Sequence, residues 1–172
     1  MNKLLWTLAA LGAWEGGWWL RRRSLRSSTF DEAKAQARRL GRPLVVVGAP
    51  DGGVTSGYGC GDVTIDIMKS DCPNSIQADI TKRIPLEDDS AVVFVSCVLE
   101  YVGDYDAAMR ELCRVSGGNL HVVRVEPWTL TAYFYPGAKR RVDMERVSAS
   151  CQIPVKKLAV SMPRLSLISK SR

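Results

Sequence analysis

The stretch AVVFVSCVLEYVGDYDAAMRELCRVSGGNLHVVRV, residues 91–125, decides the fold class of this chain. Its first apolar run, Ala91–Cys97, is short and rich in β-branched residues, which is typical of a strand buried on both faces. The next segment, Tyr105–Val115, has apolar residues three and four positions apart, and Asp104 is placed to cap a helix there. A pair of glycines ends that helix, and a second apolar run follows at Leu120–Val125. This order of strand, helix and strand predicts a parallel pair joined by a crossover helix.

Three further apolar runs precede this stretch and extend the predicted sheet. Leu44–Val47 is a continuous apolar run after a proline, Val63–Ile67 contains Asp66 near its end, and Ser75–Ala78 is followed directly by Asp79. Ligands of parallel α/β sheets bind beyond the carboxyl ends of the strands. We therefore expect both acids to lie at a ligand-binding edge.

The connection between the first two predicted strands is rich in glycine. GAPDGG (Gly48–Gly53) follows the first strand, and a glycine-rich turn at this place lets backbone N–H groups approach a ligand. VTSGYGCGD (Val54–Asp62) adds three more glycines, each of which disfavours a helix by about 1 kcal/mol relative to alanine. We expect a loop here where an α/β crossover usually has a helix.

The order of these motifs, AD, then IPLEDDS, then VSCVLEYV, DYDAAMREL and RVSGG, resembles the type 11 branch of class I S-adenosylmethionine-dependent methyltransferases. The resemblance covers about Leu44 to Tyr135. It implies a reduced α/β fold, with a Rossmann-like, mostly parallel sheet and flanking helices. It also implies two final antiparallel strands, for which Arg146–Cys151 and Arg164–Ser169 are the candidates.

The resemblance also implies where S-adenosylmethionine would bind. In the family the turn after the first strand and the acid of the second strand hold the amino acid and ribose parts, and the acid after the third strand meets the adenine amino group. The matching positions are Gly48, Ala49, Pro50, Asp66, Ile67, Asp79, Ile80, Ser96 and Cys97. No catalytic residue is assigned, but the candidates near an acceptor, at or beyond the ends of the last two strands, are Glu100, Tyr101, His121, Trp128, Tyr133 and Tyr135. Packing over the sheet edge is the favoured alternative for the three aromatic residues after strand five, and a solvated helix start explains Glu100 and Tyr101 equally well. His121 begins its strand, so we expect it to point away from the site.

The sequence departs from the family at the end of the first strand. Val47 stands where the family has an acid, GAPDGG replaces a triple-glycine turn, and Val92 replaces the usual acid of strand four. Asp51 is a possible substitute from the loop. Two functions therefore stay open: a methyltransferase for a small or membrane-associated acceptor, and a catalytically inactive scaffold for contacts with a partner at a membrane.

The N-terminal segment Leu4–Leu20 contains one charge, Glu15, and as a helix would extend about 26 Å. A cluster of tryptophans ends it and four arginines follow, an order typical of a membrane anchor with its basic flank in the cytoplasm. We expect residues 4–20 to contact a membrane, the domain to lie on the cytoplasmic side, and the first three arginines, Arg21, Arg22 and Arg23, to contact anionic lipid. A helix lying in the interface, a helix packed on its own domain and a cleaved signal peptide are the alternatives.

The charge distribution agrees with this division of the chain. Residues 1–42 hold nine Lys or Arg against three Asp or Glu, residues 43–138 hold six against thirteen, and residues 139–172 hold nine against two. The expected organisation is an anchor with a basic flank at 1–28, a lead-in helix at 29–42 and a methyltransferase-like domain at 43–172. The basic tracts lack interleaved aromatic residues, so nucleic acid is a less favoured partner than a membrane.

The chain has five cysteines, at positions 60, 72, 97, 113 and 151, and a single histidine. No C-x-x-C pair is present, so we expect no metal site. The odd number and the apolar setting of Cys97 and Cys113 predict reduced thiols.

Overall fold

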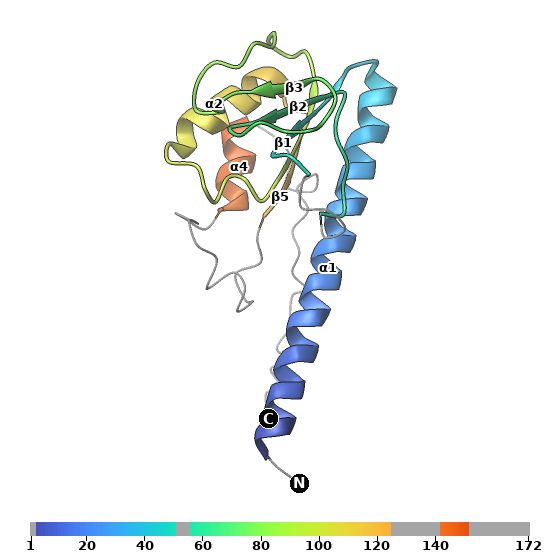
Figure 1. The fold of residues 1–172 in the computed structure, drawn as a ribbon. Coiled ribbons are helices and arrows are strands. Elements are labelled where there is room, and N and C mark those ends of the chain that lie inside the picture. The colour runs from blue at the N-terminus through green and yellow to red at the C-terminus, as the bar shows by residue number, and fades with distance from the viewer. Residues whose placement is uncertain (1–2, 51–55, 125–141, 152–172) are drawn as a thin grey trace, which may run out of the picture.

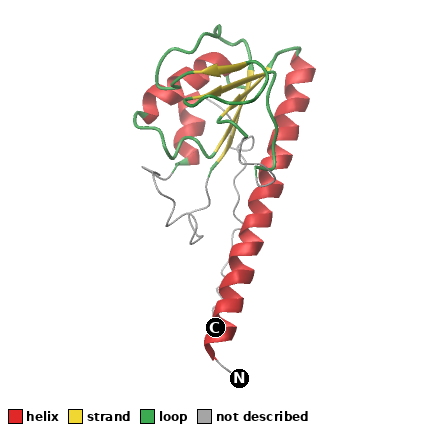
Figure 2. Cartoon of the chain, in the orientation of Figure 1, coloured by secondary structure: helices red, strands yellow, loops and turns green. Residues whose placement is uncertain are grey.

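The computed structural model describes residues 3–50, 56–124 and 142–151, which form one parallel sheet with helices on both faces (Figures 1 and 2). The strand order is β3-β2-β1-β4-β5, and every neighbouring pair is parallel. The α/β fold with a parallel sheet is therefore confirmed. The strands are β1 Leu44–Val47, β2 Val63–Asp66, β3 Ser75–Gln77, β4 Val92–Ser96 and β5 Leu120–Val123.

Among the described residues, three helices flank the sheet: α1 Lys3–Leu40, α2 Tyr105–Ser116 and α4 Met144–Cys151. The predicted ends of α2 are confirmed. Asp104 accepts a hydrogen bond from the N–H of Ala107 at 2.9 Å, and Gly117, at φ 52°, donates to the carbonyl of Cys113. Both caps pair backbone groups that a helix end leaves unsatisfied.

The central strands are buried on both faces, and alternate residues contact different helices. On β1, Val45 and Val47 belong to the core that includes α2 and α4, whereas Leu44 and Val46 belong to the core that includes α1. This two-sided burial is the physical reason for the continuous apolar runs in the sequence.

In its described part, the connection between β1 and β2 crosses the α1 face of the sheet as a loop, as the glycine content predicts. The described part of that connection, Ser56–Asp62, contains no helix. Tyr58 from this loop fills the space instead, with its ring centroid 5.1 Å from that of Phe94 on β4 and 6.2 Å from that of Phe30 on α1. The loop and α1 together cover the face.

α1 runs antiparallel to the strands. Arg26 contacts Cys97 at the carboxyl end of β4, whereas Gln36, ten residues later, contacts Asn119 and His121 at the amino end of β5. The first half of the helix therefore extends past the carboxyl edge of the sheet and away from the domain (Figure 1).

Ser28 and Thr29 precede Asp31 and Glu32 at the spacing of a capping box, a pattern that predicts a linker and then the start of a second helix. The structure contradicts this prediction. The two segments form one helix, so the predicted boundary between residues 28 and 29 falls inside α1. Ser28 donates to the carbonyl of Leu25 within the helix, and Thr29 is buried against the domain. Tertiary packing thus overrides a local capping signal.

Within the described ranges, no helix combines the length and the apolar character needed to cross a membrane.

The first of the two strands expected near the C-terminus is wrong. Arg146–Cys151, expected as a strand, lies in α4, where Met144 and Val147 share one buried face and Asp143 accepts the N–H of Glu145 at 2.9 Å. The second expected strand, 164–169, lies outside the described residues, as do Asp51, Trp128, Tyr133 and Tyr135.

The cysteines are not all reduced, contrary to expectation. Cys60 and Cys72 form one disulfide, Cys113 and Cys151 form another, and Cys97 is free. The first links the loops on either side of β2, and the second links α2 to α4. The sequence separations of 12 and 38 residues carry no spacing signal from which these pairs could be deduced.

Candidate cofactor pocket

A cavity of about 370 Å³ lies at the carboxyl ends of the strands, where α/β sheets bind ligands. Its walls come from the ends of β1 and β2, from the segment after β3 and from the turn between β4 and α2. The volume is within the usual range for a small-molecule site. The lining residues are Val47, Gly48, Ile65, Asp66, Ile67, Ala78, Asp79, Ile80, Thr81, Val98, Tyr101, Val102, Gly103 and Asp104.

Gly48 forms the corner of the cavity where β1 ends. Its φ of +88° is strained for residues with a side chain, and a Cβ atom there would lie 2.5 Å from the Cγ2 of Val98. Glycine therefore allows the turn after β1 to lie against the turn after β4. Gly48 of the glycine-rich loop thus serves close packing of two pocket walls.

Asp66, at the end of β2, holds the turn after β1, which forms one wall of the cavity. Its Oδ2 accepts the N–H of Ala49 at 2.7 Å, and its Oδ1 accepts the N–H of Met68 at 2.8 Å. A carboxylate oxygen accepts two hydrogen bonds, so each keeps capacity for a ligand hydroxyl. The side chain thus holds the turn after β1 and still presents acceptors to the cavity.

Asp79, after β3, is held in a similar way. Its Oδ1 accepts the N–H of Thr81 at 2.9 Å and the hydroxyl of the same residue at 2.8 Å. These two hydrogen bonds, the backbone one first, hold the pKa of the Asp79 carboxyl below its usual range. Asp79 is therefore an ionised acceptor at neutral pH.

The lining of the cavity carries negative charge. Asp66, Asp79 and Asp104 line it, and the lining residues given by the structure include no lysine or arginine. Carboxylates in a partly enclosed cavity attract cations and repel phosphates. The pocket therefore suits a cationic ligand rich in hydrogen-bond donors better than a nucleotide or dinucleotide.

The structure brings five of the nine expected cofactor residues to this cavity: Gly48, Asp66, Ile67, Asp79 and Ile80. Ala49 supports it through its N–H bond to Asp66, and Pro50 is not among the lining residues.

Ser96 and Cys97 are also outside the lining. Cys97 has a φ of +53°, and its Sγ accepts a hydrogen bond from Nη2 of Arg26 at 3.0 Å. The thiol thus contacts α1, and its burial raises its pKa even though the arginine acts in the opposite direction. The strand pattern does not reveal this left-handed residue.

The turn between β4 and α2 contributes more lining residues to the cavity than the sequence predicts. Val98, Val102 and Gly103 line the cavity, and Tyr101, a candidate acceptor-site residue, does too. The position of this turn directly after a buried strand was the available signal. Two other candidates, Glu100 and His121, are not among the lining residues.

Glu100 is buried, and His121 lies at the amino end of β5 with its Nε2 2.8 Å from the Oε1 of Gln36. The histidine therefore joins β5 to α1, away from the candidate pocket.

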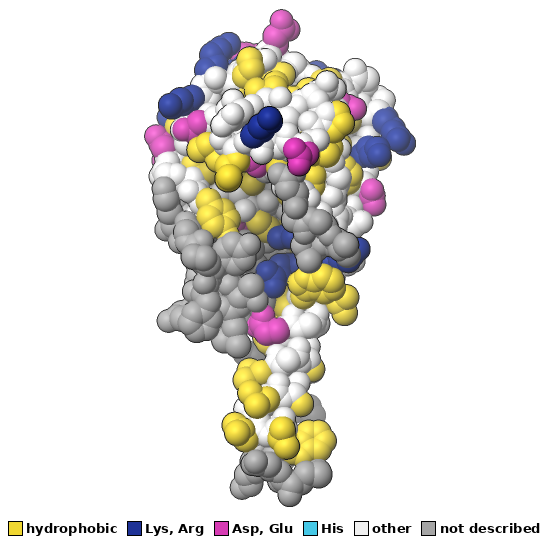
Figure 3. Space-filling model, in the orientation of Figure 1, with side chains coloured by type: hydrophobic (Ala, Val, Ile, Leu, Met, Phe, Trp, Pro, Cys, Tyr) yellow, Lys and Arg dark blue, Asp and Glu magenta, His cyan; other side chains and the backbone are white. Residues whose placement is uncertain are grey.

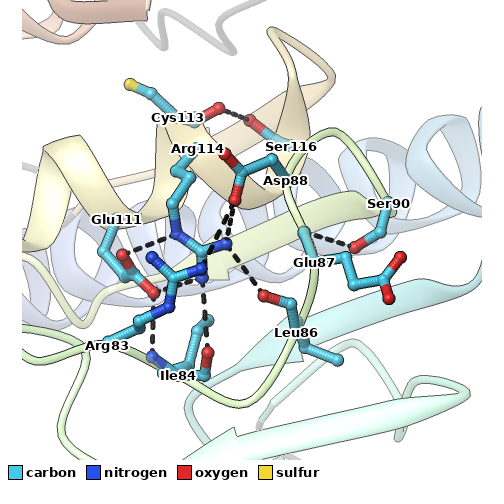
Figure 4. A network of polar contacts seen from close by, with 10 residues as sticks. All are labelled: Arg83, Ile84, Leu86, Glu87, Asp88, Ser90, Glu111, Cys113, Arg114 and Ser116. Atoms are coloured by element: carbon cyan, nitrogen blue, oxygen red, sulfur yellow. Dashed lines mark hydrogen bonds and ion pairs between the residues drawn. The ribbon is translucent and has the colours of Figure 1, made fainter.

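A polar network centred on Arg114 positions the segment between β3 and β4 (Figure 4). Its guanidinium donates to the carbonyls of Leu86 at 2.8 Å and Ile84 at 3.3 Å, and forms ion pairs with Glu111 and Asp88. Glu111 in turn accepts the N–H of Ile84 at 2.8 Å. The network therefore connects the segment after Asp79 to α2.

Comparison with known proteins gives no relative: no family model, no curated protein and no solved structure matches this chain.

Proposed function

We propose that this chain is an S-adenosylmethionine-binding, methyltransferase-like protein and that the pocket at the carboxyl edge of the sheet holds the cofactor. Asp66 faces the ribose hydroxyls and Asp79 the adenine amino group. The observation that carries the proposal is that Gly48, Asp66 and Asp79, from three different strand ends, line one cavity. The sequence resemblance gives each of these positions a cofactor contact.

The charge of the pocket supports this cofactor over others that bind at such sheet edges. S-adenosylmethionine carries a sulfonium and an ammonium cation, and adenosine offers two ribose hydroxyls and an amino group as donors. Three carboxylates match those donors. A dinucleotide would place phosphates beside the same carboxylates, without a described basic residue of the lining to pair with them.

Methyl transfer from this cofactor depends mainly on alignment of the acceptor with the methyl group. Tyr101 and Asp104 line the pocket and supply polar groups toward an acceptor. If the acceptor loses a proton during transfer, these two are the described residues of the lining suited to take part.

A second function, ligand binding without catalysis, is favoured by Val47. This valine lines the cavity where the resemblance expects an acid that helps to hold the cofactor. The missing hydrogen bond would weaken binding by about 1–3 kcal/mol if a buried cofactor group were left unpaired. An inactive scaffold would retain the pocket and lose turnover.

Calorimetric titration of the full chain in detergent micelles with S-adenosylmethionine and its demethylated product tests the proposal. We expect one site, a loss of affinity of at least tenfold in Asp66→Ala, and unchanged affinity in Asp106→Ala, an exposed acid of α2 outside the lining. Absence of binding at millimolar ligand contradicts the cofactor proposal and leaves the inactive scaffold for partner contacts, which needs no ligand. Binding without methyl transfer in the presence of candidate acceptors favours the scaffold.

A further inference from the structure

We propose that residues 4–20 of α1, here called the rod, insert end-on into an anionic membrane and hold the carboxyl edge of the sheet at its surface. This inference concerns the helix and is independent of the cofactor.

The rod is a helix whose large apolar side chains are mostly exposed. Large apolar residues are exposed along its whole length and on all sides of its axis, among them Leu4, Trp6, Leu8, Trp14 and Leu20. A helix that is apolar all round is typically buried in a larger core or in lipid. The rod thus has the surface of a buried helix, and its large apolar residues stay exposed in the part of the chain that the structure describes.

The charge at the end of the rod indicates an anionic membrane as the partner of the rod. Four arginines, here called the collar, lie where the helix reaches the domain: Arg21, Arg22, Arg23 and Arg26. Figure 3 shows apolar side chains along the rod and basic ones at its junction with the domain. Basic residues next to an apolar segment are typical of contact with anionic headgroups.

The collar also contacts the aromatic end of the rod. The guanidinium of Arg21 lies 5.7 Å from the ring centroid of Trp18, and that of Arg23 lies 5.8 Å from the ring of Trp19. Tryptophan and arginine side by side are suited to the boundary between hydrocarbon and headgroups. This order of apolar residues, tryptophan and arginine favours a bilayer over an apolar groove of a protein, which would not require the basic collar.

The continuity of α1 then fixes the position of the pocket edge relative to the membrane. Arg26 contacts Cys97, and the next residue, Val98, lines the pocket. Arg26 lies six positions after Leu20, which is about 9 Å along a helix. The headgroup region on each side of a bilayer is about 5–8 Å thick. With the rod inserted end-on, this wall of the pocket lies next to the headgroups.

Flotation of the full chain with vesicles of phosphatidylcholine, with and without phosphatidylglycerol, tests the membrane contact. We expect the protein to float with the anionic vesicles and Leu8→Glu/Leu11→Glu to remain at the bottom. Leu40→Glu is the matched control, because Leu40 is also exposed and lies at the other end of the same helix. Equal flotation of the rod variant and the control, or no flotation of the unmodified protein, overturns the inference.

Insertion end-on is tested by the depth of two tryptophans. Trp6 and Trp19 lie 13 residues apart, which is about 20 Å along the helix. In variants whose single tryptophan is Trp6 or Trp19, the other four being replaced by phenylalanine, lipids brominated deep in the acyl chain should quench Trp6 more, and lipids brominated near the headgroup should quench Trp19 more. Equal depths would show a helix lying in the membrane plane and would overturn the placement of the pocket edge. Neither experiment uses S-adenosylmethionine, so failure of the membrane inference can be told apart from failure of the cofactor proposal.

Discussion

Arg114 is the residue on which the conformation of the β3–β4 connection most depends. Its side chain is 14% exposed and its main partner, Glu111, is 12% exposed. Arg114→Met leaves that carboxylate nearly buried without its cation, and we expect a loss of about 2–3 kcal/mol in the free energy of unfolding. Urea denaturation measures this loss. Arg83→Met, at a side chain 75% exposed in the same network, should change stability by less than about 0.5 kcal/mol.

The same ion pair predicts a pH dependence. The hydrogen bond from Arg114 holds the pKa of Glu111 below its ordinary value. A carboxyl whose pKa is lower in the folded state stabilises the protein above its unfolded pKa and loses that contribution as the pH falls through the folded pKa. We expect stability to fall below about pH 4.3. The decrease should be smaller in Arg114→Met, and an identical pH profile in the variant would contradict the assignment.

At Gly48 the addition of a single Cβ atom should alter the pocket. Gly48→Ala places a Cβ atom against Val98 at a backbone conformation with φ of +88°, so we expect loss of cofactor binding and a destabilisation of about 1–2 kcal/mol. Gly59→Ala is the control, because its φ is not positive and a Cβ atom added there would meet no atom within 4 Å. Similar affinities for the two variants would show that the turn after β1 does not shape the site.

At the scale of elements, the disulfide between α2 and α4 gives a direct prediction. Closing a loop of 38 residues stabilises a fold by about 4 kcal/mol on the chain-entropy account. Cys113→Ser/Cys151→Ser should lower the free energy of unfolding accordingly, and it should do so more than Cys60→Ser/Cys72→Ser, which opens a shorter loop.

Counting thiols after rapid alkylation of the denatured protein checks the pairing itself. One free thiol per chain, Cys97, is expected, and five would contradict both disulfides. Disulfides persist mainly in oxidising compartments, so this count also tests the cytoplasmic placement expected from the arginines.

The sequence predicts elements unevenly, for physical reasons. β1 and β4 are evident because strands covered on both faces must be apolar throughout. The helix α2 is evident because one face is buried and both ends are capped by Asp104 and Gly117. The continuity of α1 is not evident, because packing of Thr29 on the domain overrides a local start signal.

At the scale of the molecule, topology explains how much of the site could be predicted. Parallel strands direct their carboxyl ends to one edge, so Asp66 and Asp79 meet at one cavity even though no local pattern relates them. Cys97 could not be placed in the same way, because its left-handed backbone and its contact with Arg26 depend on a helix 71 residues earlier in the chain. Contacts across such separations leave no local signal.

In the whole molecule, the rod, the collar and the pocket lie toward the same edge of the sheet. The rod leaves the domain beyond the carboxyl edge of the sheet, the edge at which the pocket lies, and the collar lies at that junction (Figure 1). A loop between helix and domain would remove this relation. The fixed orientation is therefore a property of the uninterrupted helix.

Photochemical cross-linking of radiolabelled S-adenosylmethionine to the full chain, followed by peptide mapping, tests the central claim most directly. The label should appear in peptides that contain the pocket segments 47–50, 65–67, 78–81 or 98–104, and an excess of the unlabelled demethylated product should prevent it. No specific label, or label confined to peptides outside these segments, would contradict a cofactor site at the carboxyl edge of the sheet.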